Sequence, residues 1–277
     1  MGIEVIKTNE GIYLIQGKYI LDLLKMYDMI GCKPLSQPME PNVKLEKDNG
    51  EKVENVQLYI SLIGSLLYAT ITRLDISHVV GVLAQFMQSP TCVHLNAGRK
   101  VLRYLKGTIN HGLFYGKEND LTVSAFSDAD WAGSVNDRRS ISWYVFLLGT
   151  TTILWSSKKQ PVIALSSTEE KYRAMTNATC EAMWIKKLMK DLCIENLQII
   201  IYCDNMSSIY LANNPVFHAR TKHIEVHYHF VREKVLSRDI EIHYVKTYMQ
   251  VADMFTKFLD STKIKKFKEY INLQDIQ

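Results

Sequence analysis

The sequence predicts an α/β fold, in which a mixed sheet with helices on its faces follows a mostly helical region. From residue 121 onward, short apolar and β-branched runs alternate with longer stretches of helical periodicity, in the order βββαβααβα. Before residue 118, apolar residues recur mainly at helical spacing. We therefore expect two parts, residues 1–118 and residues 119–277, with the complete sheet in the second.

Composition and charge narrow the class of protein. The 277 residues carry 33 Lys and Arg against 29 Asp and Glu, which gives a net charge of +4, and 47% of them are hydrophobic. This composition is that of a globular protein, and it permits nucleic acid as a partner without requiring it. Five cysteines without a CxxC pair argue against a disulfide framework or a cysteine-rich zinc module. Because we find neither a signal peptide nor an apolar stretch long enough for a bilayer, we expect an intracellular protein, cytoplasmic or nuclear, without membrane contact.

The first part is expected to be helical after an initial hairpin. Residues 3–16 alternate in hydrophobicity about an Asn-Glu-Gly turn at 9–11, which is typical of two paired strands. Residues 18–29 carry a helix-like apolar face, and 31–54 contain three prolines and many charges, as an extended connection does. Three more helices are expected at 57–70, 76–87 and 95–106.

The second part contains the strands of the predicted sheet. They are expected at 121–126, 140–148, 151–156, 198–203 and 241–245. The fourth of these is continuously apolar and β-branched, which favours a buried position in the sheet. Helices are expected at 168–192, 207–212, 223–236 and 251–271.

Three aspartates stand where strands end or helices begin. Asp128 follows the first strand, Asp204 follows the fourth, and Asp253 opens the last helix. Each alone is more readily a cap or turn residue. Together they favour a site for divalent cations such as Mg²⁺, because the ends of neighbouring strands can bring distant carboxylates to one point. Two such ions roughly 3.5–4 Å apart can activate a water and stabilise a leaving oxygen in phosphodiester cleavage.

Motifs in collinear order along nearly the whole chain resemble the Pol polyproteins of copia-type LTR retrotransposons. Those that resemble the ribonuclease H domain are SDADWAG at 127–133, WSSKKQP at 155–161, LSSTE at 165–169, YCDN at 202–205, RTKHI at 220–224 and ADMFTK at 252–257. Those that resemble the segment linking reverse transcriptase to ribonuclease H are GSLLY at 64–68, TRLDI at 72–76 and VLRYLKGT at 101–108. The sequences GIE at 2–4 and KYILDLL at 18–24 resemble the end of the reverse transcriptase domain.

The resemblance implies a fold and an activity. The fold is a ribonuclease H-like five-stranded mixed sheet with flanking helices at 119–277, preceded at 1–118 by an incomplete reverse-transcriptase tail and connection region. The activity is hydrolysis of RNA in RNA–DNA hybrids with two Mg²⁺ or Mn²⁺ ions, within a larger Pol polyprotein. Because the chain begins after the position of the polymerase aspartates, no reverse transcriptase activity is expected of it alone.

Motif matching places Asp128, Asp204 and Asp253 at three of the family's four metal-binding acids. The fourth is a glutamate, and Lys171 stands at its position. Lys171 shares a helical stripe with Met175, so we expect it to face the sheet and to pair with Asp128 or Asp204.

The two neighbouring glutamates are poor substitutes for the missing acid. Glu170 lies about 100° round the helix from Lys171 and Glu169 about 200°, so neither points to the same spot. We therefore expect hydrolysis to be impaired.

Several basic residues are candidate contacts to nucleic acid. Each basic cluster alone is most often a solvated face, but together they could follow a hybrid backbone with strongly salt-dependent affinity. A zinc site among the histidines near His223 is disfavoured because no further ligand cluster completes it. The candidates are Arg138, Arg139, Lys158, Lys159, Arg220, Lys222 and His223.

Three functional hypotheses remain from the sequence. The first is an impaired ribonuclease H, and the alternative is a non-catalytic nucleic-acid-binding remnant of a retrotransposon Pol. The third is a chain without function that folds only from about residue 118 onward. Cleavage of a labelled hybrid separates the first two, and limited proteolysis tests the third.

Overall fold

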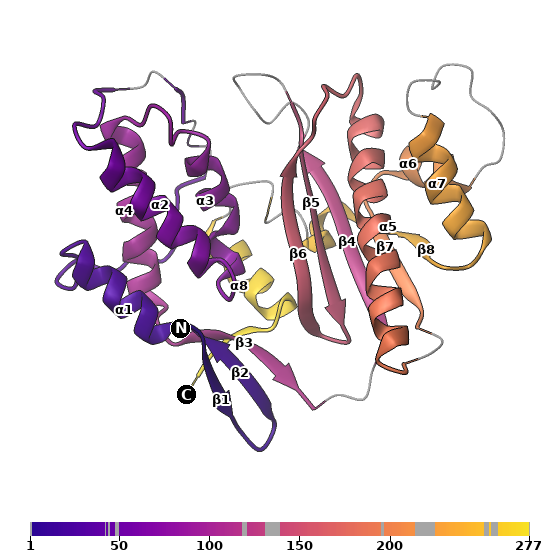
Figure 1. Ribbon diagram of the computed structural model, residues 1–277, viewed down its shortest axis with the longest axis horizontal. Coiled ribbons are helices and arrows are strands. Elements are labelled where there is room, and N and C mark those ends of the chain that lie inside the picture. The colour runs from indigo at the N-terminus through magenta and orange to yellow at the C-terminus, as the bar shows by residue number, and fades with distance from the viewer. Residues whose placement is uncertain are drawn as a thin grey trace. The chain divides into compact units, whose positions relative to one another are not determined.

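The computed structural model describes residues 2–276 except 42, 44, 48–49, 118–120, 131–138, 195–196, 214–224, 252–254 and 256–259, and only the backbone of 225–228 and 248. The chain forms two compact units, shown in Figure 1. Unit 1 comprises Met1–Lys117 and Lys257–Gln277, and unit 2 comprises Glu118–Thr256. Among the described residues, every helix is too short or too polar to cross a membrane.

Unit 1 contains a four-stranded antiparallel sheet. Its strand order is β1 (Glu4–Lys7), β2 (Gly11–Ile15), β3 (His111–Gly116) and β9 (Leu273–Asp275). The hairpin expected at 3–16 is β1 with β2, whereas β3 and β9 were not expected from the sequence. Gly112 permits the close approach of β2 and β3, because a Cβ atom there would lie 2.3 Å from Cγ2 of Ile15.

The helices of unit 1 pack around their own core. They are α1 (Gly17–Met26), α2 (Val56–Ala69), α3 (Ser77–Ala84), α4 (Cys92–Gly107) and α8 (Ser261–Tyr270), with a 3₁₀ turn η1 (Leu74–Ile76). Leu23 of α1, Leu66 of α2 and Val101 of α4 are among the residues buried in this core. Asn55 caps α2 by accepting a hydrogen bond from the Leu58 amide at 3.0 Å.

The segment after residue 256 is part of unit 1, whereas the sequence-based division placed it in the second domain, 119–277. Strand β9 pairs with β3, and α8 buries Ile264 and Phe267. Helix α8 also covers only the second part of the helix expected at 251–271, because Asp260 caps its start by accepting a hydrogen bond from the Lys263 amide at 2.9 Å.

Unit 2 contains a five-stranded mixed sheet. Its order is β6 (Thr151–Lys159), β5 (Ile141–Leu148), β4 (Val123–Asp130), β7 (Ile199–Cys203) and β8 (Glu241–Tyr244). Strands β6, β5 and β4 pair antiparallel, and β4, β7 and β8 pair parallel. The predicted fold class, an α/β fold with a five-stranded mixed sheet, flanking helices and a mostly helical preceding region, is confirmed.

The long helix of unit 2 covers one face of this sheet. Helix α5 (Ser167–Asp191) packs on β4, β5 and β7, and it also contacts α6 (Met206–Asn213) and α7 (Glu225–Leu236) (Figure 1). Tyr172, Met175 and Ala178 of α5 are fully buried in the core between helix and sheet. The start of the helix is fixed by Ser166, whose hydroxyl accepts a hydrogen bond from the Glu169 amide at 3.2 Å.

Candidate active site

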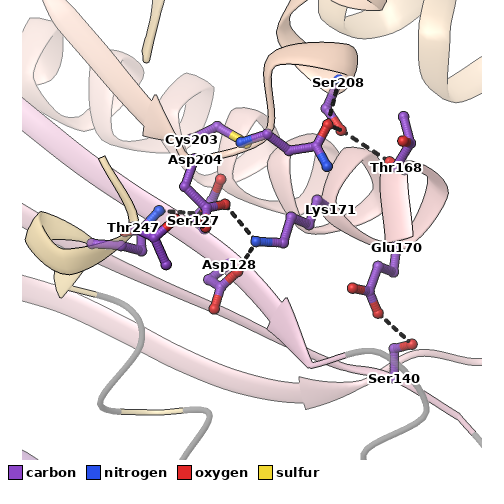
Figure 2. A network of polar contacts seen from close by, with 12 residues as sticks. Ser127, Asp128, Ser140, Thr168, Glu170, Lys171, Cys203, Asp204, Ser208 and Thr247 are labelled. Carbon is purple, nitrogen blue, oxygen red and sulfur yellow. Dashed lines mark hydrogen bonds and ion pairs between the residues drawn. The ribbon is translucent and has the colours of Figure 1, made fainter. Parts of the chain in front are cut away.

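Two aspartates meet at one edge of the unit 2 sheet. Asp128 lies near the end of β4, and Asp204 directly follows β7. Because β4 and β7 are parallel neighbours, their carboxyl ends reach the same edge. Lys171, in the first part of α5, lies over that edge, and Figure 2 shows its ammonium between the two carboxylates.

The lysine contacts both acids directly. Its Nζ lies 3.0 Å from Oδ1 of Asp128 and 2.5 Å from Oδ1 of Asp204. The other oxygen of Asp204, Oδ2, accepts a hydrogen bond from the hydroxyl of Thr247 at 3.3 Å. The helical stripe predicted pairing with one aspartate or the other, and the ammonium pairs with both.

The three charged side chains are largely removed from water. The exposed fraction is 3% for Asp128, 5% for Asp204 and 17% for Lys171. Burial alone would lower the pKa of Lys171, but the two carboxylates raise this pKa well above its usual range. Lys171 is therefore a cation at neutral pH, and it compensates two acids whose isolated burial would be costly.

Glu170 points away from this pair, as its position round the helix predicted. It is only 1% exposed, and its Oε2 accepts a hydrogen bond from the Ser140 hydroxyl at 2.9 Å (Figure 2). Burial, with a smaller contribution from Asp128, raises the pKa of Glu170 to about 8, although the Ser140 hydrogen bond opposes the shift. The carboxyl group is therefore mostly protonated at neutral pH.

Glu169 is also turned away from the acid pair. Its Oε1 accepts hydrogen bonds from Nε and Nη2 of Arg173 at 3.1 and 3.0 Å, and its Oε2 accepts one from the Leu165 amide at 3.0 Å. Neither neighbouring glutamate therefore adds a carboxylate to the Asp128 and Asp204 pair.

Three residues that support the site were not predicted from the sequence. Ser140 holds Glu170, and Thr247 holds Asp204. Gln160 donates hydrogen bonds from Nε2 to the hydroxyl of Ser142 at 2.8 Å and to the backbone carbonyl of Glu170 at 3.0 Å. The only available signal was position, since Thr247 and Gln160 closely follow the ends of predicted strands.

The described part of this site does not fit a divalent cation. Mg²⁺ takes oxygen ligands at about 2.0–2.1 Å and retains several waters. Here an ammonium contacts the two carboxylates that would have to supply those ligands. Among the described residues, no group of three or more His, Cys, Asp or Glu side chains is placed to hold a metal ion. Asp253, the third predicted acid, lies outside the described residues.

Part of the predicted basic surface is described. Arg139 is exposed just before β5, and Lys158 and Lys159 are exposed at the end of β6. Because Lys158 pairs with Ser142 and Lys159 with Ile141, these three basic residues lie at one end of the sheet. Ile141 also pairs with Asp130, so this is the end of β4 near which Asp128 lies. The remaining candidates, Arg138, Arg220, Lys222 and His223, lie outside the described residues.

Comparison with known proteins finds several retrovirus-related Pol polyproteins. No model of a protein family matches the chain. The retrovirus-related Pol polyprotein from transposon RE1 of Arabidopsis thaliana is 44% identical over 274 residues, covering 99% of this chain and 19% of the relative. The Pol polyprotein from transposon TNT 1-94 of Nicotiana tabacum is 36% identical over 286 residues, covering 99% of this chain and 21% of the relative.

Solved structures with a similar arrangement include LC11-RNase H1, isolated from compost. It is 11% identical and covers 53% of this chain and 97% of its own, with a TM-score of 0.39. The chain spans about a fifth of the length of the Pol polyproteins it matches. Along nearly all of its own length, the chain matches a part of the Pol polyproteins of copia-type retrotransposons.

Proposed function

We propose that unit 2 is a retrotransposon-derived ribonuclease H that binds RNA–DNA hybrids but hydrolyses the RNA strand poorly. The observation that carries this proposal is the contact of the Lys171 ammonium with both Asp128 and Asp204, at 3.0 and 2.5 Å. The resemblance to ribonuclease H implies that hydrolysis depends on Mg²⁺ or Mn²⁺, with two ions in a complete site. We assign Asp128, Asp204 and Asp253 as the remnant of the catalytic acid set.

The lysine opposes metal binding in two ways. It uses the carboxylate oxygens that a cation would need, and it adds a positive charge beside any ion that displaced it. Two unit charges about 4 Å apart repel by about 4 kcal/mol at an effective dielectric constant of 20, and a divalent ion doubles this cost. A metal ion therefore competes poorly with an ammonium that is already in place.

Hybrid binding is supported by charge and by family. Arg139, Lys158 and Lys159 are exposed at the end of the sheet near which Asp128 lies, where they can contact phosphates. We include Arg138, Arg220, Lys222 and His223 in the proposed surface. We also propose the remainder of a Pol polyprotein as a partner, because the chain corresponds to about a fifth of its relatives.

Cleavage of a labelled RNA–DNA hybrid by the purified full chain tests the proposal. With Mg²⁺ or Mn²⁺ we expect slow cleavage by the wild type and faster cleavage by Lys171→Glu, by about 10²-fold or more, since general-acid and metal-site groups typically contribute on that scale. Adding Asp128→Asn to Lys171→Glu should abolish the gain. The matched control is Lys186→Glu, which makes the same charge change on the same helix at a lysine paired with Asp239.

Two other outcomes are informative. Robust wild-type cleavage that is lost in Asp128→Asn would contradict the impairment. Hybrid binding without cleavage in both the wild type and Lys171→Glu would select the alternative, a non-catalytic nucleic-acid-binding domain.

A further inference from the structure

We infer that Lys171 is a built-in counter-ion, which replaces a divalent cation between Asp128 and Asp204 and makes the acid pair independent of metal. Unit 2 then needs no metal ion for its stability. A phosphate backbone can also approach the site without one, and this second part rests on the proposed function. Lys171 then stabilises the acid pair, in addition to standing where the resemblance places a glutamate.

The buried carboxylates of Asp128 and Asp204 need a compensating positive charge. The carboxylates of Asp128 and Asp204 are 3% and 5% exposed, so each would be strongly destabilising if it stood alone. Lys171 contacts both of them, and Thr247 adds a hydrogen bond to Asp204. Removing one member of a buried ion pair is far more costly than removing an exposed pair, because the remaining charge is left unpaired.

Unlike a bound metal ion, Lys171 is a permanent part of the site. Lys171 is anchored in α5, where the adjacent Tyr172 is fully buried and Ser166 caps the start of the helix. A bound metal ion dissociates and depends on its concentration in solution, whereas a tethered group has a fixed effective concentration. The ammonium therefore offsets one of the two negative charges of the acid pair under all metal conditions.

Lys171 also changes the net charge of its cluster with Asp128 and Asp204 by two units relative to a glutamate. Two carboxylates and one ammonium leave one negative charge, whereas two carboxylates and a glutamate would leave three. The lysine lowers the repulsion of a phosphate group in the way a cation would, and Lys158 and Lys159 are exposed at the same end of the sheet. Hybrid binding by the wild type should accordingly be insensitive to divalent ions at constant ionic strength.

Thermal unfolding of the full chain, followed in EDTA and in millimolar MnCl₂, tests the stability part. The wild-type Tm should not change with Mn²⁺. Lys171→Met should have a lower Tm in EDTA and should regain part of it in Mn²⁺, because the emptied acid pair can then take the ion. The control Lys186→Met removes the same charge from α5, where the side chains of Lys186 and Asp239 are 36% and 27% exposed. Its Tm in EDTA should lie close to that of the wild type and should not change with Mn²⁺.

Binding of Mn²⁺ gives a second readout, from the electron paramagnetic resonance signal of the free ion. Lys171→Met should bind at least one ion more than the wild type. If Lys171→Met fails to fold, the wild type alone still decides the question, because a wild-type Tm that rises with Mn²⁺ would overturn the inference.

Fluorescence anisotropy with a non-cleavable 2′-O-methyl RNA–DNA hybrid tests the binding part. The wild-type Kd should be equal in EDTA and in Mg²⁺, whereas Lys171→Glu should bind about tenfold more weakly in EDTA and recover in Mg²⁺. No wild-type binding under any condition would refute the proposed function and leave the Tm result standing. Wild-type binding that requires Mg²⁺ would refute this inference and leave the proposed function standing.

Discussion

Arg73 donates two parallel hydrogen bonds to the carboxylate of Asp75, from Nε to Oδ1 at 3.0 Å and from Nη2 to Oδ2 at 2.7 Å. Neither side chain is exposed to solvent. Tyr104 donates a third hydrogen bond to the same carboxylate at 2.5 Å, and Nζ of Lys268 lies 3.7 Å from it. Burial alone would raise the pKa of Asp75, but Arg73 and Lys268 hold that pKa well below its usual range. This network joins η1, α4 and α8 within unit 1.

Arg73→Met should destabilise unit 1 by about 3–5 kcal/mol, because it leaves the buried Asp75 carboxylate without its main partner. Hydrogen exchange of α4 amides at increasing urea concentration measures this loss. Lys100→Met is the matched control, since Lys100 pairs with Glu40 at 2.8 Å where the side chains are 38% and 51% exposed. That change should cost less than about 1 kcal/mol. Equal effects of the two substitutions would contradict the structural importance of the network.

Glu170→Gln should alter how the stability of unit 2 depends on pH. The pKa of Glu170 is about 8 in the folded chain against an ordinary 4.5, so the folded state binds more protons between these pH values. Wild-type stability should therefore fall relative to Glu170→Gln as pH rises from 4.5 to about 8, by a total of up to about 4 kcal/mol. Urea unfolding followed by tryptophan fluorescence measures it, because all four tryptophans fall within unit 2. A difference that is constant across this range would argue against a protonated Glu170.

Phe267→Ala should destabilise unit 1 and not unit 2. Phe267 of α8 is 6% exposed, and its truncation should cost about 3 kcal/mol because its packing in the core is removed. Hydrogen exchange of α4 should accelerate while the tryptophan transition of unit 2 stays in place. Tyr270→Ala, on the same helix but 49% exposed, serves as the control. A shift of the tryptophan transition by a similar amount would contradict the assignment of residues 257–277 to unit 1.

Replacing both Lys158 and Lys159 with glutamine should weaken hybrid binding and make it less sensitive to salt. Removing one lysine–phosphate interaction should reduce the slope of log K against log salt by about 0.9, so the slope of the double variant should fall by up to about 1.8. Anisotropy titrations at a series of KCl concentrations give the slope. Lys186→Gln with Lys187→Gln, on α5, makes the same change in charge and should leave the slope nearly unaltered. An unchanged slope in the Lys158 and Lys159 variant would remove these residues from the binding surface.

Local periodicity anticipated the strongest feature of the site. The step from Lys171 to Met175 placed the lysine on the buried stripe of a helix expected at 168–192, and the structure has this helix at Ser167–Asp191. The same periodicity predicted that Glu170 would point away from the acid pair. It could not identify Ser140 as the partner of Glu170, because that contact depends on where β5 begins relative to a helix 30 residues later in the chain.

Long-range pairing explains what the sequence failed to predict in unit 1. Strand β3 contains Gly112 and Gly116 among six residues, which weakens any strand pattern. Strand β9 has only three residues, Leu273–Asp275, and its pairing with β3 gives it its place. Neither strand carries a local signal strong enough to compete with the helical pattern around it.

The pairing of β9 with β3 also sets an order of events on the ribosome. Strand β9 and helix α8 follow unit 2 in the chain, so all of residues 118–256 are synthesised before unit 1 can gain its fourth strand. Until then β3 is an edge strand, and the buried Arg73–Asp75 pair lacks Lys268. Unit 2, whose sheet is built from one continuous stretch, can fold during synthesis, whereas unit 1 is completed only after its last segment has emerged.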